Sequence, residues 1–524
     1  MKRINKCVFA IAAMTATALC GCSKNKKEVS FWSSFGGAYT QYLNPIVDDI
    51  GKELGFTIDH TSKKSYGGIL DAMVSAIATG KYPSVAVGYP DHFAQYHGSK
   101  ILRPLDDLAK DIVSDFEPSY MPENYLVEQD GTKHLYGLPF NKSTELLGYN
   151  AVFVDYCDSL YPGEDLKNVP ATWDEWADYT NPTSKVSRYM STFDALIDGK
   201  AKLYAKQNED GRVDSDKFSL NVEKEGYTLV LDYSKAEKAT TRLLTWDSVD
   251  NAFITLVRQW GGQYTKLPED QYGVALKKRA GKVLFANNDN IDLTVDMLKF
   301  FNRLHKQRIF GTPGDFGSNI SYSSDPFKKG SVMFVVCSSG GMAHNDGMWE
   351  HRFVSAPIPY KTADKKLVIS QGANICLTKN GDEAKSFALM KALTTGKFQT
   401  RWAMDTGYFP ASKSSENSDE YKAFLEGTSY ADEVAVYKRE GAKTNHNHYS
   451  NESEHWTRFV DDAFIGSAKV RDYVAKIIPN VFANVKVADL ETEAKYLNEI
   501  KEVLNQANLK DDSNINIELA DKLK

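Results

Sequence analysis

Residues 29–91 alternate between short apolar runs and helical patterns, and this alternation limits the fold more than any other feature of the chain. Apolar runs begin at Val29, Phe56 and Ser84, and two helical stretches separate them. The second stretch carries apolar residues at helical spacing and ends at Gly80. Strand, helix, strand, helix, strand predicts a parallel sheet covered by helices, that is, an α/β fold.

The loops that follow the first and third of these strands are candidate ligand contacts. Ligands of open α/β sheets bind beyond the carboxyl ends of the strands. Small polar and aromatic residues fill both loops, at 33–37 and 89–91. We therefore expect Ser34, Tyr89 and Asp91 to line a binding site.

The stretch HLYGLPFNKSTELLGYN (134–150) places small hydrogen-bonding side chains where a strand should enter a core. We interpret it as the wall of a cleft, with Asn141, Ser143 and Thr144 facing a small polar molecule. The apolar residues 146–149 then continue into a second core.

Further loops combine an aromatic ring with Ser, Asn, Gly or Asp. Neutral hydroxyls and amides hydrogen-bond sugar hydroxyls, and rings stack on the C–H faces of sugars. Each loop alone is typical of an ordinary turn, but their number predicts one shared site. The additional candidates are Tyr66, Trp173, Ser338, Ser339, Gly372 and Tyr408.

Charge and motifs exclude several classes of function. The 524 residues carry a net charge of −6 without a basic stripe, which argues against nucleic-acid binding. No phosphate-binding loop, calcium loop or catalytic serine motif is present, so we expect neither a cofactor nor a metal. The three histidines in 446–455 match no metal-ligand spacing and are typical of a solvated loop. The many Asp and Glu residues leave a glycosidase pair open.

The amino terminus resembles a bacterial lipoprotein signal. Three basic residues precede a short apolar stretch and the sequence LCGC. We expect residues 1–21 to be removed, Cys22 to carry lipid and residues 22–28 to form a tether; an ordinary secretory signal cut elsewhere is the alternative. The other cysteines, Cys157, Cys337 and Cys376, form no disulfide framework.

Several segments together resemble family 1 of the extracellular solute-binding proteins that serve ABC importers. The segments are YGLPFNKSTELLGYN, PATWDEWADY, VVCSSGGMA, ISQGAN, TGYFPASKS and FIGSAKVRDYV. The resemblance implies a type II periplasmic-binding-protein fold, with two α/β lobes, a hinge and an interlobe cleft. The implied division is 29–140 with about 290–342 for lobe 1, and 141–289 with about 343–524 for lobe 2. We interpret residues 184–239 as an elaboration of the second lobe.

Within this family the chain looks similar to glycerol-3-phosphate or glycerophosphodiester binders and to their sugar-binding relatives. The resemblance adds Arg471, which pairs with phosphate in the glycerol-phosphate branch, and matches Trp173 to a ring near the ligand. That branch has an acidic residue where Pro90 stands here. Both ligand classes stay open at this point, and the neutral groups and rings favour carbohydrate.

The implied function is that of a binding protein without catalytic residues. We expect it to be lipid-anchored on the extracytoplasmic face of the cell membrane and to deliver its ligand to permease subunits of an ABC transporter. A secreted glycan or phosphodiester hydrolase is the alternative from another class. A surface adhesin is disfavoured because the chain has no long repeats.

Overall fold

The computed structural model describes residues 29–207, 213–279, 281–285, 287, 289–344, 353–427, 456–484 and 517–519. The predicted signal peptide, Cys22 and the tether lie outside these residues, as does the segment with the three histidines.

The first sheet confirms the strand and helix alternation at the start of the chain. Its strand order is β2-β1-β3-β18-β6, with β1, β2 and β3 parallel and β18 antiparallel to both of its neighbours. The strands are β1 (Val29–Ser33), β2 (Ile58–Ser62), β3 (Val85–Gly88), β6 (Gly137–Ser143) and β18 (Gln371–Leu377). The helices of this lobe are α1 (Gly37–Leu54), α2 (Tyr66–Thr79), α3 (Pro90–Gly98), α10 (Glu383–Thr394), α11 (Gly396–Thr406), α12 (Lys413–Glu416) and α13 (Asp419–Gly427). A small hairpin, β4 (Tyr125–Val127) and β5 (Lys133–Leu135), completes it.

The glycines that end α1 and α2 explain why these helices stop where the sequence predicts. Gly55 has φ 75° and Gly80 has φ 68°, both in the left-handed region that glycine adopts without steric cost. The chain therefore reverses its direction within a few residues of each helix end and returns to the sheet.

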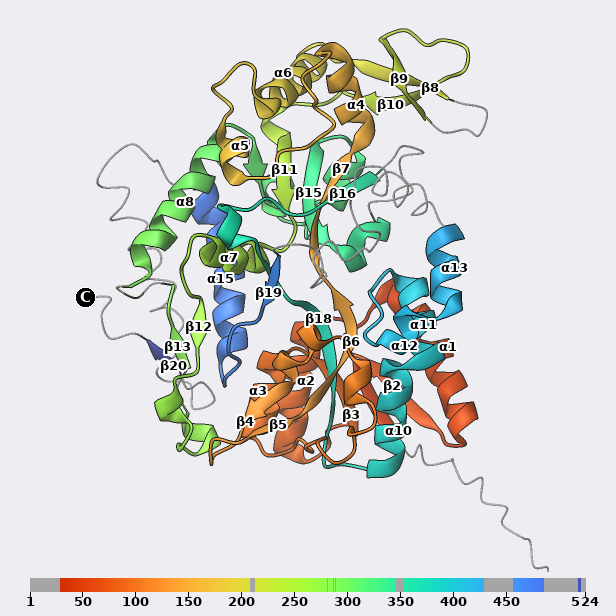
Figure 1. The fold of residues 1–524 in the computed structure, drawn as a ribbon, viewed down its shortest axis with the longest axis vertical. Helices are drawn as coiled ribbons and strands as arrows, with labels where there is room; N and C mark the ends of the chain where they lie inside the picture. Colours follow the sequence, from red (N-terminus) through yellow and green to blue (C-terminus); the bar gives the residue numbers. More distant parts are fainter. Residues whose placement is uncertain are drawn as a thin grey trace, which may run out of the picture.

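The second sheet has the order β14-β11-β15-β7-β16. Its strands are β7 (Glu145–Asn150), β11 (Arg242–Trp246), β14 (Phe310–Gly311), β15 (Val332–Ser338) and β16 (Phe353–Ala356). The surrounding helices are α4 (Ala151–Leu160), α5 (Trp173–Ala177), α6 (Lys185–Asp198), α7 (Val249–Gln259), α8 (Ile291–Lys306), α9 (Ser324–Lys328) and α15 (Ser467–Asn484). Figure 1 shows this sheet and its helices above the first lobe.

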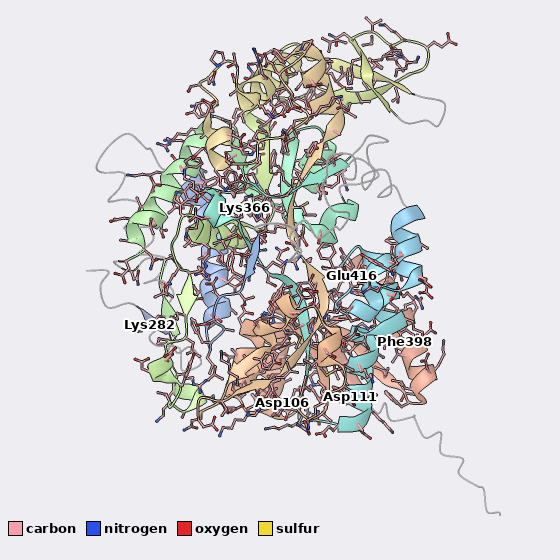
Figure 2. The ribbon with its side chains drawn as sticks, viewed as in Figure 1. Asp106, Asp111, Lys282, Lys366, Phe398 and Glu416 are labelled. Carbon is pink, nitrogen blue, oxygen red and sulfur yellow. The ribbon has the colours of Figure 1, made fainter. Side chains whose placement is uncertain are left out.

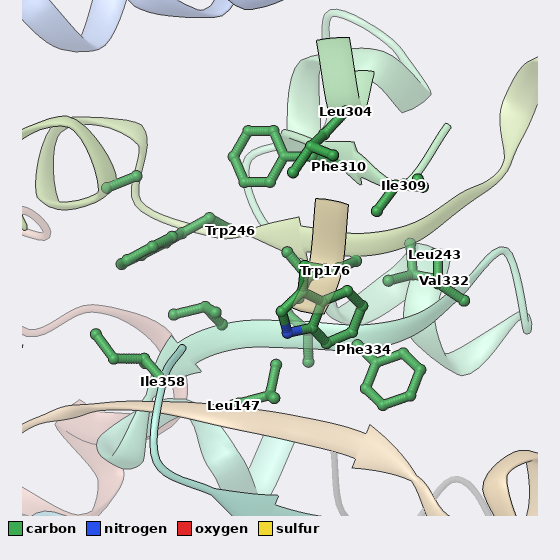
Figure 3. Packing of buried hydrophobic residues seen from close by; sticks show 14 of the residues in the cluster. Leu147, Trp176, Leu243, Trp246, Leu304, Ile309, Phe310, Val332, Phe334 and Ile358 are labelled. Atoms are coloured by element: carbon green, nitrogen blue, oxygen red, sulfur yellow. The ribbon is translucent and has the colours of Figure 1, made fainter. Parts of the chain in front are cut away.

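Two separate hydrophobic cores support the two lobes. One contains residues from β1, β3, β6, β18 and α10, and the other contains residues from β7, β11, β15, α7, α8 and α15. In the second core Trp176 packs against Phe334, with ring centroids 5.1 Å apart, and Leu147 and Val332 lie nearby (Figure 3). The described residues thus form two independently packed α/β units, as the fold prediction requires.

The sheets divide the chain differently from the predicted boundaries. Residues 290–342 were assigned to the first lobe, but they supply α8, β14 and β15 to the second. Residues 371–427 were assigned to the second lobe, but they supply β18 and α10–α13 to the first. The reason is that a fully buried apolar run such as β15 fits the centre of either sheet, so its sequence carries no information about its partners.

The chain crosses between the lobes at two described points. Thr144 alone separates β6 from β7, and Ser370 alone separates β17 (Leu367–Ile369) from β18. The stretch 368–378 reads as a single strand in the sequence, whereas the structure breaks it at Ser370 and pairs β17 with β19 (Thr457–Phe459). In Figure 1 β6 and β18 run side by side from the lower lobe towards the upper one.

Residues 184–239 form an additional part of the second lobe, as predicted. They comprise α6 and a three-stranded antiparallel sheet of β8 (Lys202–Gln207), β9 (Val213–Leu220) and β10 (Tyr227–Asp232). Figure 1 shows this sheet at the far end of the upper lobe from the lobe boundary.

A second extension, which we call the arm (residues 264–279 and 281–285), reaches from the second lobe alongside the first. It contains β12 (Thr265–Lys266) and β13 (Gly281–Val283), which pair with each other, and β13 also pairs with β20 (Ile517–Leu519). Figure 2 labels Lys282 on this extension and Asp106 on the first lobe. The arm therefore contributes a wall on the side where the two lobes meet.

Candidate functional site

Three predicted residues of the first lobe meet beyond the ends of its parallel strands. Tyr66 begins α2 directly after β2, and Tyr89 follows β3. Their ring centroids lie 4.3 Å apart, and Ser34, which follows β1, is buried beside the Tyr66 hydroxyl. Because the carboxyl ends of parallel strands share one edge of a sheet, residues far apart in the sequence converge here.

Asn141 and Tyr408 extend this cluster from the other side. The Asn141 amide donates to the Tyr66 hydroxyl at 3.4 Å, and its buried oxygen has no hydrogen-bond partner within the described ranges. The Tyr408 ring lies parallel to Trp402 at 6.3 Å and 6.0 Å from Tyr39. Burial raises the pKa of Tyr408 well above its usual value, so its hydroxyl stays protonated at neutral pH. We call Tyr39, Tyr66, Tyr89, Asn141 and Tyr408 the ring cluster.

The ring cluster touches the second lobe at Gly340. The Tyr39 hydroxyl donates to the Gly340 carbonyl at 2.9 Å. A β-carbon at Gly340 would lie 2.6 Å from the Tyr408 ring, so only glycine allows this approach. The two lobes are thus in direct contact at this end of the boundary.

A buried ion pair lies behind the cluster on β6. The Lys142 ammonium, with no exposed side-chain surface, donates to Glu123 and to the Gly372 carbonyl at 3.0 Å. Asn374 also donates to Glu123, at 2.8 Å. Burial lowers the pKa of Lys142, while the Glu123 carboxylate opposes that shift. Nothing in the sequence marks Lys142 or Glu123 as a site residue, because lysine and glutamate are ordinarily surface residues.

Gly372 is required by backbone geometry. Its φ is 94°, and a β-carbon there would lie 2.0 Å from the Asn141 carbonyl oxygen. The register of β18 against β6 shifts just after it, between Ala373 and Asn374. Its carbonyl faces the Lys142 ammonium, so Gly372 helps to fix the crossing strands.

The predicted Ser and Thr residues at the strand ends hold the crossing together. The Ser339 amide donates to the Thr144 carbonyl at 2.8 Å, and the Thr144 amide donates to the Ser339 hydroxyl at 3.1 Å. Ser143 lies 3.5 Å from the side-chain oxygen of Gln371, and Ser338 pairs with Glu145 across the second sheet. These contacts tie β6, β7 and β15 where the chain first changes lobes.

Arg471 contributes a charged group from the second lobe. It lies on α15 and donates to Asp250 and to the side-chain oxygen of Asn251, both on α7. Its guanidinium also lies 5.7 Å from the centre of the Tyr89 ring on the first lobe. The side chain keeps 28% of its surface exposed, so it is both a structural partner of Asp250 and accessible from the cleft.

Glu145 is a second ionisable group at the crossing that sequence reasoning missed. It is 1% exposed, and one of its oxygens accepts from the Trp246 indole at 2.8 Å. Burial raises its pKa to about 8, with the negative charge of Asp250 adding to the effect and Arg471 opposing it.

Two adjacent cavities lie between the lobes. The inner cavity has a volume of about 70 Å³ and takes its walls from both lobes, including four predicted residues, Tyr89, Asp91, Gly372 and Arg471. The outer cavity has a volume of about 250 Å³ and lies between α3, the β4–β5 hairpin, the arm and residues 460–465. The two share a wall made by Pro90, Glu123, Val460, Asp461, Asp462 and Ala463.

One predicted site residue lies elsewhere. Trp173 is fully buried in the core of the second lobe, where its indole donates to Gln259 at 2.8 Å and its ring stacks on Trp246. The capping box of Thr172 and Glu175 that starts α5 places the ring there. The prediction that Trp173 contacts a ligand is therefore corrected: its ring fills a core.

The described residues also bear on metal binding, membrane insertion and disulfide formation. No group of three or more His, Cys, Asp or Glu side chains in the described ranges is arranged to hold a metal ion. Among the described helices, none has both the length and the apolar character needed to cross a membrane. Cys157, Cys337 and Cys376 are buried, and none of the three takes part in a disulfide.

Two α/β lobes that share a polar cleft lined by rings and charged side chains define a ligand-binding protein of the periplasmic type. Residues 46–425 match the family model described as bacterial extracellular solute-binding protein, and the chain belongs to that family.

Two relatives similar in sequence are glycerol-3-phosphate-binding proteins of other bacteria. The sn-glycerol-3-phosphate-binding periplasmic protein UgpB of Pectobacterium atrosepticum is 30% identical over 158 residues, which are 29% of this chain and 34% of that protein. UgpB of Escherichia coli K12 is 29% identical over 174 residues, 32% of this chain and 38% of that protein. The chain thus matches little more than a third of the length of these relatives.

Solved structures share the fold over almost the whole chain. UgpB of Mycobacterium tuberculosis, in complex with glycerophosphocholine, superimposes with a TM-score of 0.61 at 14% identity, covering 91% of this chain and 98% of that one. The maltose/maltodextrin-binding domain MalE of Bdellovibrio bacteriovorus, bound to maltotriose, gives 0.58 at 16% identity, covering 92% and 99%. These likenesses confirm the predicted two-lobe α/β fold.

Proposed function

We propose that this protein captures a carbohydrate between its lobes and delivers it to the permease of an ABC importer. The observation that carries the choice of ligand is the charge around the inner cavity. Its walls include four carboxylates, of which Glu123 is paired with the Lys142 ammonium, and one guanidinium, Arg471, which is paired with Asp250. The carboxylates are Asp91, Glu123, Asp461 and Asp462.

This balance favours a neutral, hydroxyl-rich ligand over a phosphate monoester. Carboxylates accept hydrogen bonds from sugar hydroxyls, whereas a carboxylate about 4 Å from a phosphate charge costs about 4 kcal/mol at an effective dielectric constant of 20. Tyr89, the member of the ring cluster that lines the inner cavity, supplies a flat apolar surface on which a sugar ring can stack.

Closure of the lobes is the proposed working step. A ligand shifts the equilibrium towards the closed form only if it contacts that form better than the open one. Tyr89 and Arg471 face the inner cavity from opposite lobes, so a ligand held by both gains contacts on closure. The closed form would then dock on the permease.

A glycerol-3-phosphate or glycerophosphodiester ligand is the second candidate. The names of the curated relatives and the position of Arg471 in the cavity wall favour it. An arginine fork suits phosphate, and a diester carries one negative charge fewer than a monoester, which fits the acidic wall better.

A thermal-shift screen tests the ligand class. Monosaccharides, oligosaccharides, glycerol 3-phosphate and glycerophosphodiesters are added to the purified protein without residues 1–21. A true ligand at 100 times its dissociation constant adds about 2.7 kcal/mol of stability. Stabilisation by phosphate compounds alone would replace carbohydrate with the second candidate, and stabilisation by neither class would overturn the proposal.

The hydrolase alternative is tested with the same compounds. Each stabilising compound is incubated with the protein and its fragments are sought by mass spectrometry. A binding protein returns the compound intact, whereas accumulation of cleavage product in proportion to protein concentration supports a hydrolase.

The proposal also places the protein on the extracytoplasmic face of the cell membrane through lipid on Cys22. The apolar stretch before LCGC and the membership in an extracellular family support this. In cells fed a labelled fatty acid, the parent chain should incorporate label and Cys22→Ser should not. Equal labelling of both chains would contradict the anchor.

A further inference from the structure

The outer cavity lies directly against the inner one. Six residues line both spaces, so only their side chains stand between the two. Small-molecule sites usually have volumes of roughly 300–1,000 Å³. Neither cavity reaches that range alone, and the two together just do.

The arm closes the outer cavity and is fastened to the first lobe by Arg279. This side chain is 5% exposed and donates to the carbonyls of Val127, at 2.6 Å, and Glu128 on the first lobe. It also donates, at 3.1 Å, to the carbonyls of Gln271 and Tyr272 within the arm. One guanidinium therefore holds two segments in register, so the wall that the arm provides has a defined position.

The cations around the outer cavity are engaged elsewhere or face solvent. Arg279 is occupied by four carbonyl oxygens, and His97 is hydrogen-bonded to Glu128 at 2.8 Å. Lys133 is exposed at the rim. Within the described ranges, the one buried guanidinium of this wall thus has four of its five N–H donors engaged by carbonyl oxygens, which leaves little capacity for an anion.

The groups that do face this space are rings, carboxylates and apolar side chains. Tyr125 comes from β4 and Tyr272 from the arm, and both are only partly buried. Burial raises the pKa of Asp461 to about 6, and Asp462 accepts from the Leu267 amide at 3.0 Å. Rings beside carboxylates suit a neutral hydroxylated unit or a cationic one, and they repel an anionic one.

We infer that the outer cavity is a second compartment of the ligand site and holds a non-anionic second unit of a two-unit ligand, such as the second ring of a disaccharide. This inference rests on the proposed function, because the inner cavity must hold the first unit. The protein then selects ligands by length as well as by chemistry, and the Tyr272 ring from the arm recognises the distal unit.

Isothermal titration of the full mature chain tests this with matched pairs of probes. Each pair has a one-unit and a two-unit member: monosaccharides against their disaccharides, and glycerol 3-phosphate against glycerophosphocholine. In the pair that binds, the two-unit member should bind about tenfold more tightly or better. Equal affinities within a binding pair would overturn the second compartment and leave the proposed function standing, whereas binding by no probe would withdraw both.

Three variants locate the preference in the arm. Tyr272→Ala should reduce the preference for the two-unit probe at least about fivefold and leave the one-unit affinity within about twofold, because only the distal unit reaches this ring. Tyr272→Phe keeps the ring and should keep the preference. Tyr227→Ala removes a partly exposed tyrosine from β10, outside both cavities, and is the control. A preference that survives Tyr272→Ala unchanged would overturn the assignment.

Discussion

The two lobes present different chemistry to the cleft they share. The first lobe offers the ring cluster, in which Tyr66, Tyr89 and Tyr408 stand beside the amide of Asn141. The second lobe offers the guanidinium of Arg471, which is paired to Asp250. Carboxylates come from both lobes: Asp91 and Glu123 from the first, and Asp461 and Asp462 from the second. Rings stack on a ligand with no need of a partner, whereas charges taken out of water require one.

This difference assigns separate tasks to the lobes. The ring cluster stands on strand ends and helix starts of a single sheet, so it is formed whether or not the other lobe is near. The charges of the second lobe become desolvated when the lobes meet, which makes their contribution depend on closure. We therefore expect the first lobe to provide affinity and the second to provide closure and selection by charge.

The largest expected effect is on stability and comes from Trp173, a ring that lies in the core of the second lobe and not in the cleft. Trp173→Ala should lower the free energy of unfolding by about 3–5 kcal/mol, because it empties a fully buried site. Ligand affinity of the folded protein should stay within about threefold of the parent. Urea unfolding and calorimetric titration measure the two quantities, and a loss of affinity at unchanged stability would return Trp173 to the cleft.

The next effect concerns Lys142, the buried cation that follows Asn141 on β6. Lys142→Met leaves Glu123 without its ammonium partner and should cost about 3 kcal/mol or more of stability. The double variant with Glu123→Gln removes both charges and should recover most of the loss. A double variant no more stable than the single one would show that Lys142 acts through its bond to the Gly372 carbonyl instead.

Sequence reasoning predicts best where local chemistry decides the structure. The first parallel sheet, the helix ends at Gly55 and Gly80 and the capping box before Trp173 follow from patterns a few residues long. The convergence of Tyr66 and Tyr89 also follows, since topology alone brings parallel strand ends together.

The features that sequence reasoning missed depend on long-range pairing. The apolar run of β15 fits either sheet, and nothing local marks Ser370 as the point where a strand changes lobes. Trp173 sits beside polar residues like a cleft ring, yet the cap that starts α5 turns it inwards. Lys142 and Glu123 are ordinary surface residues in a sequence, and their pairing, 19 positions apart, appears only in three dimensions.

A smaller effect is the pH dependence of stability that comes from Glu145, at the point where the chain first crosses between the lobes. Glu145 has its pKa raised from 4.5 to about 8 by burial, so the folded chain binds this proton more tightly than the unfolded chain does. The stabilisation that protonated Glu145 adds to the free energy of unfolding is fully present below about pH 4.5. It is lost as pH rises towards 8, by at most about 1.4 kcal/mol per pH unit.

Glu145→Gln should remove this dependence, because glutamine stays neutral and still accepts from the Trp246 indole. The variant should match the parent near pH 4.5 and exceed its stability by about 2 kcal/mol or more at pH 8. Urea midpoints across this range measure the difference. Parallel curves for the two proteins would mean that Arg471 and Asn251 keep Glu145 ionised in the folded chain.

The smallest expected effects are on ligand binding, and they come from changing Tyr408 on the first lobe and Arg471 on the second. Tyr408→Ala removes one face of the ring cluster and should weaken binding of the cognate ligand about tenfold, since a stacking contact contributes about 1 kcal/mol beyond its area. Tyr408→Phe keeps the ring and should remain within about threefold of the parent.

Arg471→Gln supplies the matched change on the opposite lobe. It leaves Asp250 unpaired and should shift the lobes towards the open form, so that the rate of ligand release rises while the first encounter with the ring cluster is retained. Stopped-flow binding separates the two rates. If Tyr408→Ala raised the release rate and Arg471→Gln slowed only association, the division of tasks between the lobes would be reversed, because the rings would then act in closure and the cation in capture.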